Sequence, residues 1–127
     1  MSLFNKINIA VIGATGYTGL DLINILSRHP KVKIMNLCAT KNIGKKISFF
    51  DKRIKANLPK ITNIKKIDWK NLDLVFLSLP NGEAQKIVRK TFHKYKNLKY
   101  IDLSADFRIS SHKDYYKNYK IKHLAKN

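Results

Sequence analysis

Short apolar runs alternate along the chain with segments in which apolar residues recur every three or four positions. Continuous apolar runs predict buried strands, and the second spacing predicts helices with one buried face. The pattern predicts strands at 7–12, 32–38, 73–79 and 99–103, helices at 17–28 and 83–95, and a weaker strand at 64–67. Strands that alternate with helices indicate an α/β fold, a mostly parallel sheet with helices on both faces.

The helix predicted at 17–28 has a clear buried face. Asp21 is expected in its first turn, where the helix dipole favours an acid, and His29-Pro30 is expected to end it. The segment 40–57 is basic and predicts a short helix or an irregular connection. The side chains predicted to face the sheet are Leu20, Ile23, Leu26 and Ile25.

Three glycines, Gly13, Gly16 and Gly19, separate the first predicted strand from the first predicted helix. This order is typical of a Rossmann-like dinucleotide site, because the chain must turn sharply, backbone N–H groups must approach a pyrophosphate, and the helix must pack close to the sheet. A phosphate-binding P-loop is excluded, since Thr18 stands where that motif needs its second glycine. The residues predicted to hold the cofactor diphosphate are Gly13, Ala14, Thr15, Gly16, Tyr17, Thr18 and Gly19.

The segment after the second predicted strand contains no acid, since none occurs between Asp21 and Asp51. An acid at that position usually binds the ribose 2′-hydroxyl of NAD, and it would repel the 2′-phosphate of NADP. The chain instead offers a hydroxyl and positive charge there, from Thr40 and Lys41 followed by Lys45 and Lys46. NADP is therefore favoured over NAD; the alternative is that these lysines belong to a general surplus.

The chain of 127 residues carries a formal charge of +18, with 22 lysines and 4 arginines. Scattered lysine favours a solvated basic surface over a specific nucleic-acid site, and it can help attract an anionic cofactor and substrate. One cysteine excludes an internal disulfide, and no apolar run is long enough for a membrane span. We therefore expect a cytosolic protein with no membrane partner, short enough to be part of a longer dehydrogenase.

Two further motifs follow later strands. Phe76-Leu77-Ser78-Leu79-Pro80-Asn81-Gly82 ends a buried strand in a turn, and Ile101-Asp102-Leu103-Ser104-Ala105-Asp106-Phe107-Arg108 leaves the last strand as a loop. Together with the glycine motif they resemble the N-terminal part of the N-acetyl-γ-glutamyl-phosphate reductases, enzymes of arginine biosynthesis related to aspartate-semialdehyde dehydrogenase. The resemblance covers about residues 6–119. It implies an NADPH-dependent reduction of a small acyl phosphate to a semialdehyde, with release of phosphate, in a homo-oligomeric enzyme.

The resemblance also implies roles for individual residues. The glycine motif would hold the cofactor diphosphate, and Thr40 and Lys41 would lie near the 2′-phosphate, where family members often have Ser-Arg. A turn bordering the nicotinamide would consist of Pro80, Asn81 and Gly82, although many members have His where Asn81 stands. Arg108 would bind the substrate phosphate; the alternative is a structural ion pair among Asp102, Asp106 and Arg108.

The family's nucleophile, a cysteine in an Asn-Pro-Gly-Cys setting, and its later acid/base histidine are both missing. Cys38 lies in a predicted buried strand and is expected to be a core residue. His29, His93, His112 and His123 show no ligand or triad spacing and are expected at the surface. We therefore predict an NADP-binding domain at 1–109 and a polar, basic segment at 110–127 leading toward a missing α+β catalytic and dimerisation domain. The chain alone should contain no catalytic residue.

Two alternatives stay open. A sister reductase acting on aminoadipyl or aspartyl phosphate would have the same cofactor half. A stand-alone nucleotide-binding module, binding nucleic acid through its lysines, is a different class, and steeply salt-dependent binding to DNA or RNA would distinguish it.

Overall fold

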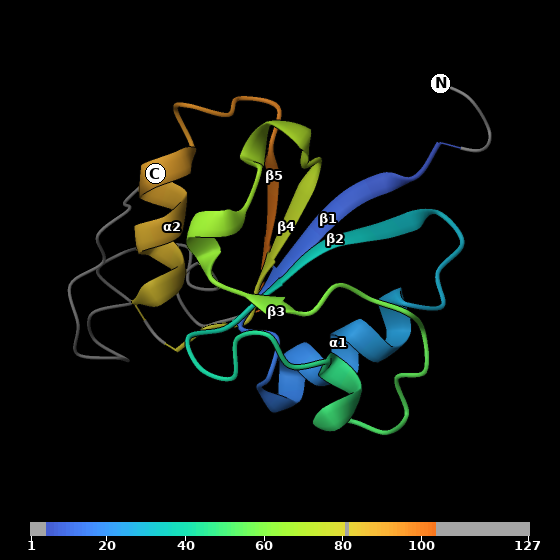
Figure 1. The fold of residues 1–127 in the computed structure, drawn as a ribbon. Coiled ribbons are helices and arrows are strands. Elements are labelled where there is room, and N and C mark those ends of the chain that lie inside the picture. Colours follow the sequence, from blue (N-terminus) through green and yellow to red (C-terminus); the bar gives the residue numbers. More distant parts are fainter. Residues whose placement is uncertain (1–4, 81, 104–127) are drawn as a thin grey trace.

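The computed structural model describes residues 5–80 and 82–103. In this part of the chain five strands form one parallel sheet in the order β3-β2-β1-β4-β5 (Figure 1). The chain builds outward from β1 to one side and then returns to build outward on the other, which is the predicted Rossmann-like, doubly wound arrangement. The strands are β1 (Ile7–Ile12), β2 (Val32–Cys38), β3 (Ile61–Thr62), β4 (Leu74–Leu77) and β5 (Lys99–Asp102).

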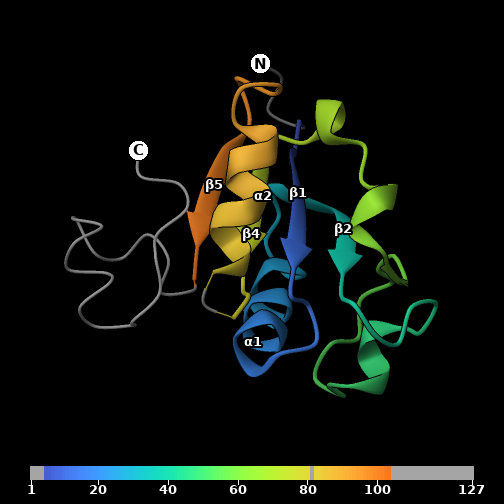
Figure 2. The ribbon, with the colours of Figure 1, turned by 90° about the vertical axis from the view of Figure 1, so that its left-hand side faces the viewer.

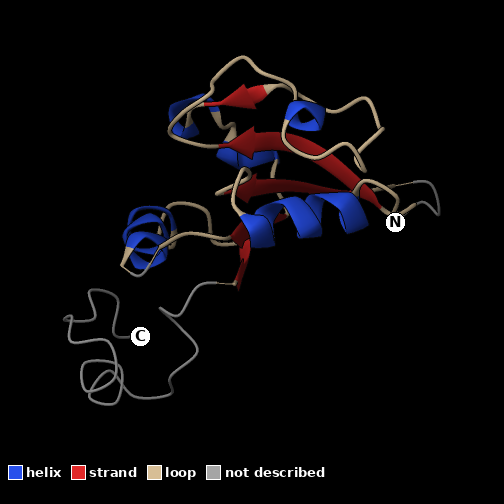
Figure 3. Ribbon diagram, turned by 90° about the horizontal axis from the view of Figure 1, so that it is seen from below, coloured by secondary structure: helices blue, strands red, loops and turns tan. Residues whose placement is uncertain are grey.

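The central strand β1 is buried on both faces of the sheet. Its side chains alternate, so Ile9 and Val11 join a core beneath α1 (Tyr17–Leu26), whereas Ala10 and Ile12 join a second core beneath α2 (Glu83–Thr91). Figures 1 and 3 show the two helices flanking the sheet. The predicted α/β class with helices on both faces is confirmed.

The prediction of a strand at 64–67 is wrong. A 3₁₀ helix, η2 (Ile64–Lys66), lies there, and Asn63 begins it by accepting the Lys65 N–H at 2.9 Å. Ile64 and Ile67 are three residues apart, so one 3₁₀ turn places both against the α2-side core. The third strand instead comes earlier, at Ile61–Thr62, where it pairs with the end of β2.

Several predicted ends are displaced by a few residues. α1 ends at Leu26 and α2 at Thr91, each followed by hydrogen-bonded turns. Ile25, predicted to face the sheet, is 60% exposed because it lies on the outer side of α1. The basic connection contains one short 3₁₀ helix, η1 (Ile47–Phe49), and another, η3 (Trp69–Asn71), precedes β4. No helix in the described ranges is long and apolar enough to cross a membrane.

The prediction that Asp21 lies in the first turn of α1 is wrong. Asp21 lies one turn later. Its carboxylate accepts a hydrogen bond from Arg53 Nη2 at 2.6 Å. Arg53 also donates to both carboxylate oxygens of Asp51, at 3.0 Å from Nε and 2.6 Å from Nη2. These ion pairs link Asp21 to Arg53, 32 positions later in the sequence, and through it to Asp51. They hold the connection after η1 against the outer side of α1.

Replacing Arg53 with Met should weaken the fold in a pH-dependent way. Hydrogen bonds from Arg53 lower the pKa of Asp51. A carboxyl group with a lowered pKa in the folded state stabilises the fold above its unfolded pKa, and this stabilisation is lost as the pH falls through the folded pKa. Arg53→Met should therefore lower the free energy of unfolding modestly at pH 7, and this deficit should shrink as both proteins are titrated below about pH 4.

Urea unfolding over a pH series measures this difference. Lys52→Met is the matched control, since it removes a neighbouring charge and leaves the carboxylate pairs of Arg53 intact. A deficit for Arg53→Met that is equal at neutral and acidic pH would exclude the ion pairs as its cause.

Candidate dinucleotide site

The turn after β1 is fastened to both neighbouring strands. The N–H groups of Gly13 and Ala14 both donate to the Cys38 carbonyl oxygen at the end of β2, at 2.9 and 3.0 Å. On the other side, the Ser78 N–H donates to the Ile12 carbonyl oxygen at 2.8 Å. Figure 2 shows the arrowheads of β1 and β2 pointing the same way, with α1 beginning just beyond them. The turn therefore lies at the carboxyl edge of the sheet, where open α/β sheets bind ligands.

Gly13 and Gly19 are required by the packing of the turn itself. Gly13 has a φ of +90°, and a Cβ there would lie 1.9 Å from the Ser78 carbonyl oxygen. A Cβ at Gly19 would lie 2.3 Å from the Gly13 carbonyl oxygen, since α1 passes directly against the turn. These two glycines thus allow strand, turn and helix to approach closely, whether or not a ligand binds.

Gly16 is different. It begins α1 with an ordinary φ of −75°, and a Cβ there would meet only the Gly13 carbonyl oxygen, at 3.8 Å. The first helical bond runs from the Leu20 N–H to the Gly16 carbonyl oxygen at 2.8 Å, so the N–H groups of Tyr17 and Thr18 precede the intrahelical ladder. Packing within the described residues therefore does not require glycine at position 16, which stands beside backbone donors at the positive end of a helix, where a diphosphate fits.

The loop after β2 brings Thr40 and Lys41 to the same edge of the sheet. Both are exposed, and so is the whole stretch from residue 40 to residue 46. Asn42, at a φ of +65°, turns the chain, and the Gly44 N–H then donates to the Ile61 carbonyl oxygen at 2.8 Å. A hydroxyl and several ammonium groups, with no carboxylate in the loop, thus follow the strand next to the glycine turn.

The loop after β4 is the third segment at this edge. Pro80 is exposed and accepts a hydrogen bond from the Glu83 N–H at 3.1 Å, and Gly82 adopts a φ of +90° to begin α2. Because β2, β1 and β4 are adjacent and parallel, the three loops that follow them lie at one edge. Asn81 and Arg108 lie outside the described residues, so their predicted roles stay predictions.

Cys38 is a core residue, as predicted. It is 1% exposed, burial raises the pKa of its thiol, and its Sγ lies 3.8 Å from Thr62 Oγ1. A buried, protonated thiol is a poor nucleophile. His29 and His93 are exposed, as predicted, whereas His112 and His123 fall outside the described ranges. Within those ranges no group of three or more His, Cys, Asp or Glu side chains could hold a metal ion.

Two backbone groups at the turn are not marked in the sequence: the Cys38 carbonyl oxygen, which accepts from Gly13 and Ala14, and the Ser78 carbonyl oxygen, which lies against Gly13. Every residue has a carbonyl group, so no residue type marks the ones that matter. The three glycines also look alike in the sequence. The structure separates the two that packing requires, Gly13 and Gly19, from Gly16, where a Cβ would make only an ordinary contact.

Residues 8–121 match the family described as the semialdehyde dehydrogenase NAD binding domain. The chain belongs to this family. Within the semialdehyde dehydrogenase fold, the glycine turn and the loops after β2 and β4 occupy the carboxyl edge of the domain's sheet.

Individual relatives of this semialdehyde dehydrogenase domain carry a more specific enzyme name than the family does. A protein from Ehrlichia ruminantium (strain Gardel) named N-acetyl-gamma-glutamyl-phosphate reductase is 42% identical over 87% of this chain and 33% of its own length. The protein of the same name from Ehrlichia canis is 44% identical over 90% of this chain and 32% of its own. This chain therefore spans about a third of the length of the curated relatives it matches.

Among solved structures, aspartate semialdehyde dehydrogenase with NADP from Candida albicans matches with a TM-score of 0.63 and 23% identity. The match covers 85% of this chain and 32% of that one. At this identity the likeness is one of fold, and it agrees with the parallel sheet described above.

Proposed function

We propose that this chain is the NADP-binding part of an N-acetyl-γ-glutamyl-phosphate reductase, a cytosolic, homo-oligomeric enzyme that reduces an acyl phosphate to a semialdehyde and releases phosphate. The relatives that carry this name support the reaction. The observation that carries the cofactor role is Gly16, a glycine that packing does not require, beside the first N–H groups of α1 and at the carboxyl edge of the sheet. The lack of a carboxylate in the loop after β2 favours NADP.

In this proposal each loop holds one part of the cofactor. The turn at residues 13–19 binds the diphosphate, with the N–H groups of Tyr17 and Thr18 as donors, because those of Gly13 and Ala14 already donate to Cys38. Thr40 and Lys41 bind the 2′-phosphate. Pro80, Asn81 and Gly82 border the nicotinamide. When bound, NADPH supplies the hydride that reduces the acyl group. Residues 1–109 form the cofactor domain, and Arg108 near its end binds the phosphate of the substrate.

The nucleophile must come from elsewhere. Cys38 is the chain's only cysteine, and it is buried with a raised thiol pKa. The four histidines include no pair with the spacing of a ligand set or a triad. We therefore expect these 127 residues to bind NADPH and to catalyse no reduction of an acyl phosphate by themselves.

Titration of the chain with NADPH and with NADH, followed by nicotinamide fluorescence at fixed ionic strength, tests the proposal. NADPH should bind at least about tenfold more tightly, which corresponds to about 1.4 kcal/mol. Lys41→Gln should weaken NADPH binding by about three- to tenfold and leave NADH binding unchanged, because only NADPH carries the phosphate.

Lys33→Gln is the matched control, since Lys33 is an exposed lysine within β2 and away from its carboxyl end. It should preserve the preference for NADPH. Equal affinity for the two cofactors in the parent chain would contradict the proposed 2′-phosphate site, and the same loss in both variants would assign the effect to net charge.

A further inference from the structure

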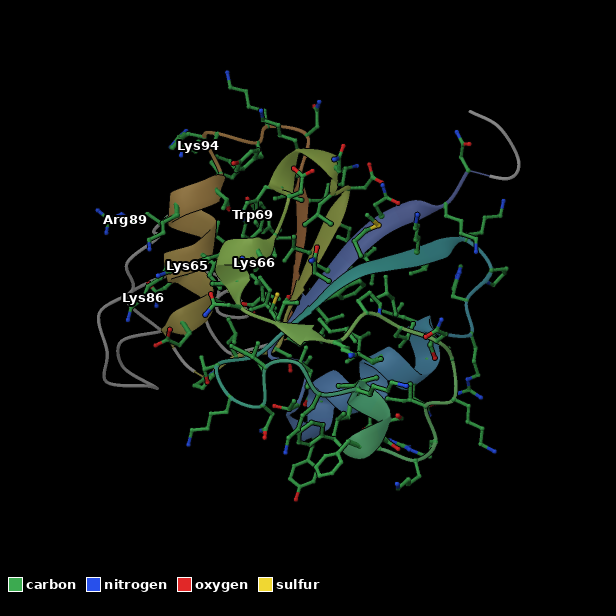
Figure 4. All side chains as sticks on the ribbon, in the orientation of Figure 1. Lys65, Lys66, Trp69, Lys86, Arg89 and Lys94 are labelled. Atoms are coloured by element: carbon green, nitrogen blue, oxygen red, sulfur yellow. The ribbon has the colours of Figure 1, made fainter. Side chains whose placement is uncertain are left out.

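Basic side chains from three segments gather on the side of the molecule formed by α2 and η2. Lys65 and Lys66 come from η2, Lys86 and Arg89 from α2, and Lys94 from the turn after α2. Figure 4 shows these five side chains on one side of the molecule, with Trp69 among them. We call these six residues the α2 basic face.

The tertiary fold brings these segments together. Ile64 and Ile67, which flank the two lysines of η2, pack in the same core as Ile87 and Val88 of α2. Trp69 packs against this core too. Buried apolar contacts beneath the face therefore hold η2 and α2 side by side, so the basic residues stay close together without contacts between their own side chains.

The charges on this face are largely without counter-charge. Lys86 lies 3.5 Å from Glu83, while Lys65, Lys66, Arg89 and Lys94 make no ion pair with any described carboxylate. Lys86 and the exposed Lys90 are four residues apart on α2, and the exposed Lys94 follows in the turn after the helix, so positive charge repeats along this segment. Such a row attracts an extended polyanion.

Trp69 of this face forms an aromatic pair with Tyr95, which follows Lys94. The Trp69 ring stacks on the Tyr95 ring with centroids 6.2 Å apart and an interplanar angle of 21°. Both side chains are half-buried, so the core holds the pair in place while part of it stays accessible. An aromatic surface within a basic track is the arrangement that binds single-stranded nucleic acid, because bases stack on the rings while phosphates contact the cations.

We propose that the α2 basic face binds single-stranded nucleic acid without sequence preference. Lysine predominates on it, and lysine contacts phosphates as a point charge without reading bases. The face is formed by the helix on the opposite side of the sheet from α1, so binding here is independent of the cofactor turn at Gly16.

The chain's single tryptophan provides a local probe. Trp69 is the only tryptophan in the 127 residues, so its fluorescence reports directly on the α2 basic face. Titration with a single-stranded oligonucleotide of uniform base should quench or shift this emission. The logarithm of the binding constant should fall with the logarithm of salt concentration with a slope of about −3, as expected for about four phosphate contacts.

Matched charge variants locate the contact. A variant with Lys65, Lys66, Lys86 and Arg89 each replaced by Gln should bind a labelled oligonucleotide at least about tenfold more weakly and show a nearly flat salt dependence. The control replaces the exposed Lys31, Lys33, Lys55 and Lys60 by Gln, which removes the same charge. It should change the affinity by less than about threefold, because these lysines lie outside the proposed contact. They attract the oligonucleotide only by long-range electrostatics, which salt screens.

Two more variants separate stacking from charge and this face from the cofactor site. Trp69→Leu, followed by anisotropy of the labelled oligonucleotide, should weaken binding by about fivefold or more through the loss of base stacking. Gly16→Ala should leave oligonucleotide affinity unchanged. Weaker oligonucleotide binding in this variant would mean that the oligonucleotide occupies the dinucleotide site.

Other outcomes would overturn the proposal as well. Equal losses in the two fourfold variants would assign binding to the total charge of the chain. Binding without a change in Trp69 emission would place the contact on another face. Poly-glutamate that binds as tightly as an oligonucleotide of equal charge would indicate an acidic protein as the partner in place of nucleic acid.

Discussion

Gly13→Ala is expected to destabilise the folded chain by more than about 4 kcal/mol, a large fraction of the stability of a domain this size. The alanine Cβ would lie 1.9 Å from the carbonyl oxygen of Ser78 and 2.7 Å from its carbonyl carbon. Neither backbone segment can move away easily, since the Gly13 N–H is bonded to Cys38 and the Ser78 N–H to Ile12. Urea unfolding followed by circular dichroism measures the loss.

Gly44→Ala is the matched control for this prediction. Gly44 has nearly the same backbone conformation, with a φ of +92°, but a Cβ there would meet no atom within 4 Å. It should cost only the left-handed backbone strain, about 1–2 kcal/mol. If Gly13→Ala costs no more than Gly44→Ala, the close approach of the β1 and β4 loops is not what requires glycine at position 13.

Gly16→Val should have the opposite profile: a retained fold and lost cofactor binding. The Gly16 backbone is ordinary for an L-residue, and a Cβ there contacts nothing closer than 3.8 Å, so the free energy of unfolding should change by less than about 1 kcal/mol. The valine side chain would occupy the space proposed for the diphosphate. NADPH affinity should therefore fall by about tenfold or more.

A graded series strengthens this test. Gly16→Ala should have an intermediate effect on NADPH affinity, because its smaller side chain fills less of the space. Unfolding by urea should give similar midpoints for the parent chain and both variants. Unchanged NADPH affinity in Gly16→Val, in a chain that is folded, would show that the diphosphate does not bind at this turn.

The periodicity of the sequence was sufficient for the parts of the fold that pack locally. β1 and β2 have the predicted bounds, since apolar residues predominate in both strands and each strand follows a lysine, Lys6 or Lys31. α1 begins at Tyr17, directly after Gly16, the second glycine of the motif. The prediction at 64–67 was wrong because Ile64 and Ile67 fit a 3₁₀ turn as well as a strand, and only the Asn63 side chain marks the difference.

The sequence predicted which segments form the site, but not which of its glycines are needed for packing. Sequence spacing brought the glycine turn, the loop after β2 and the loop after β4 into one hypothesis, because loops that follow parallel strands meet at one edge. It gave no means of distinguishing Gly16 from its two neighbours. That distinction depends on the Ser78 carbonyl oxygen, which is 65 residues from Gly13 along the chain and beside it in the fold, and on the Gly13 carbonyl oxygen, which lies against Gly19.

The sequence by itself determined the class of fold, the family and the segments that form the candidate cofactor site, because these depend on local periodicity and on short motifs. Tertiary structure alone decided where β3 lies, that Asp21 pairs with Arg53, and which glycines are needed for packing. It also gathered lysines from η2 and α2 around Trp69. Each of these depends on contacts between residues distant in sequence, whose distances are set only when the sheet has formed.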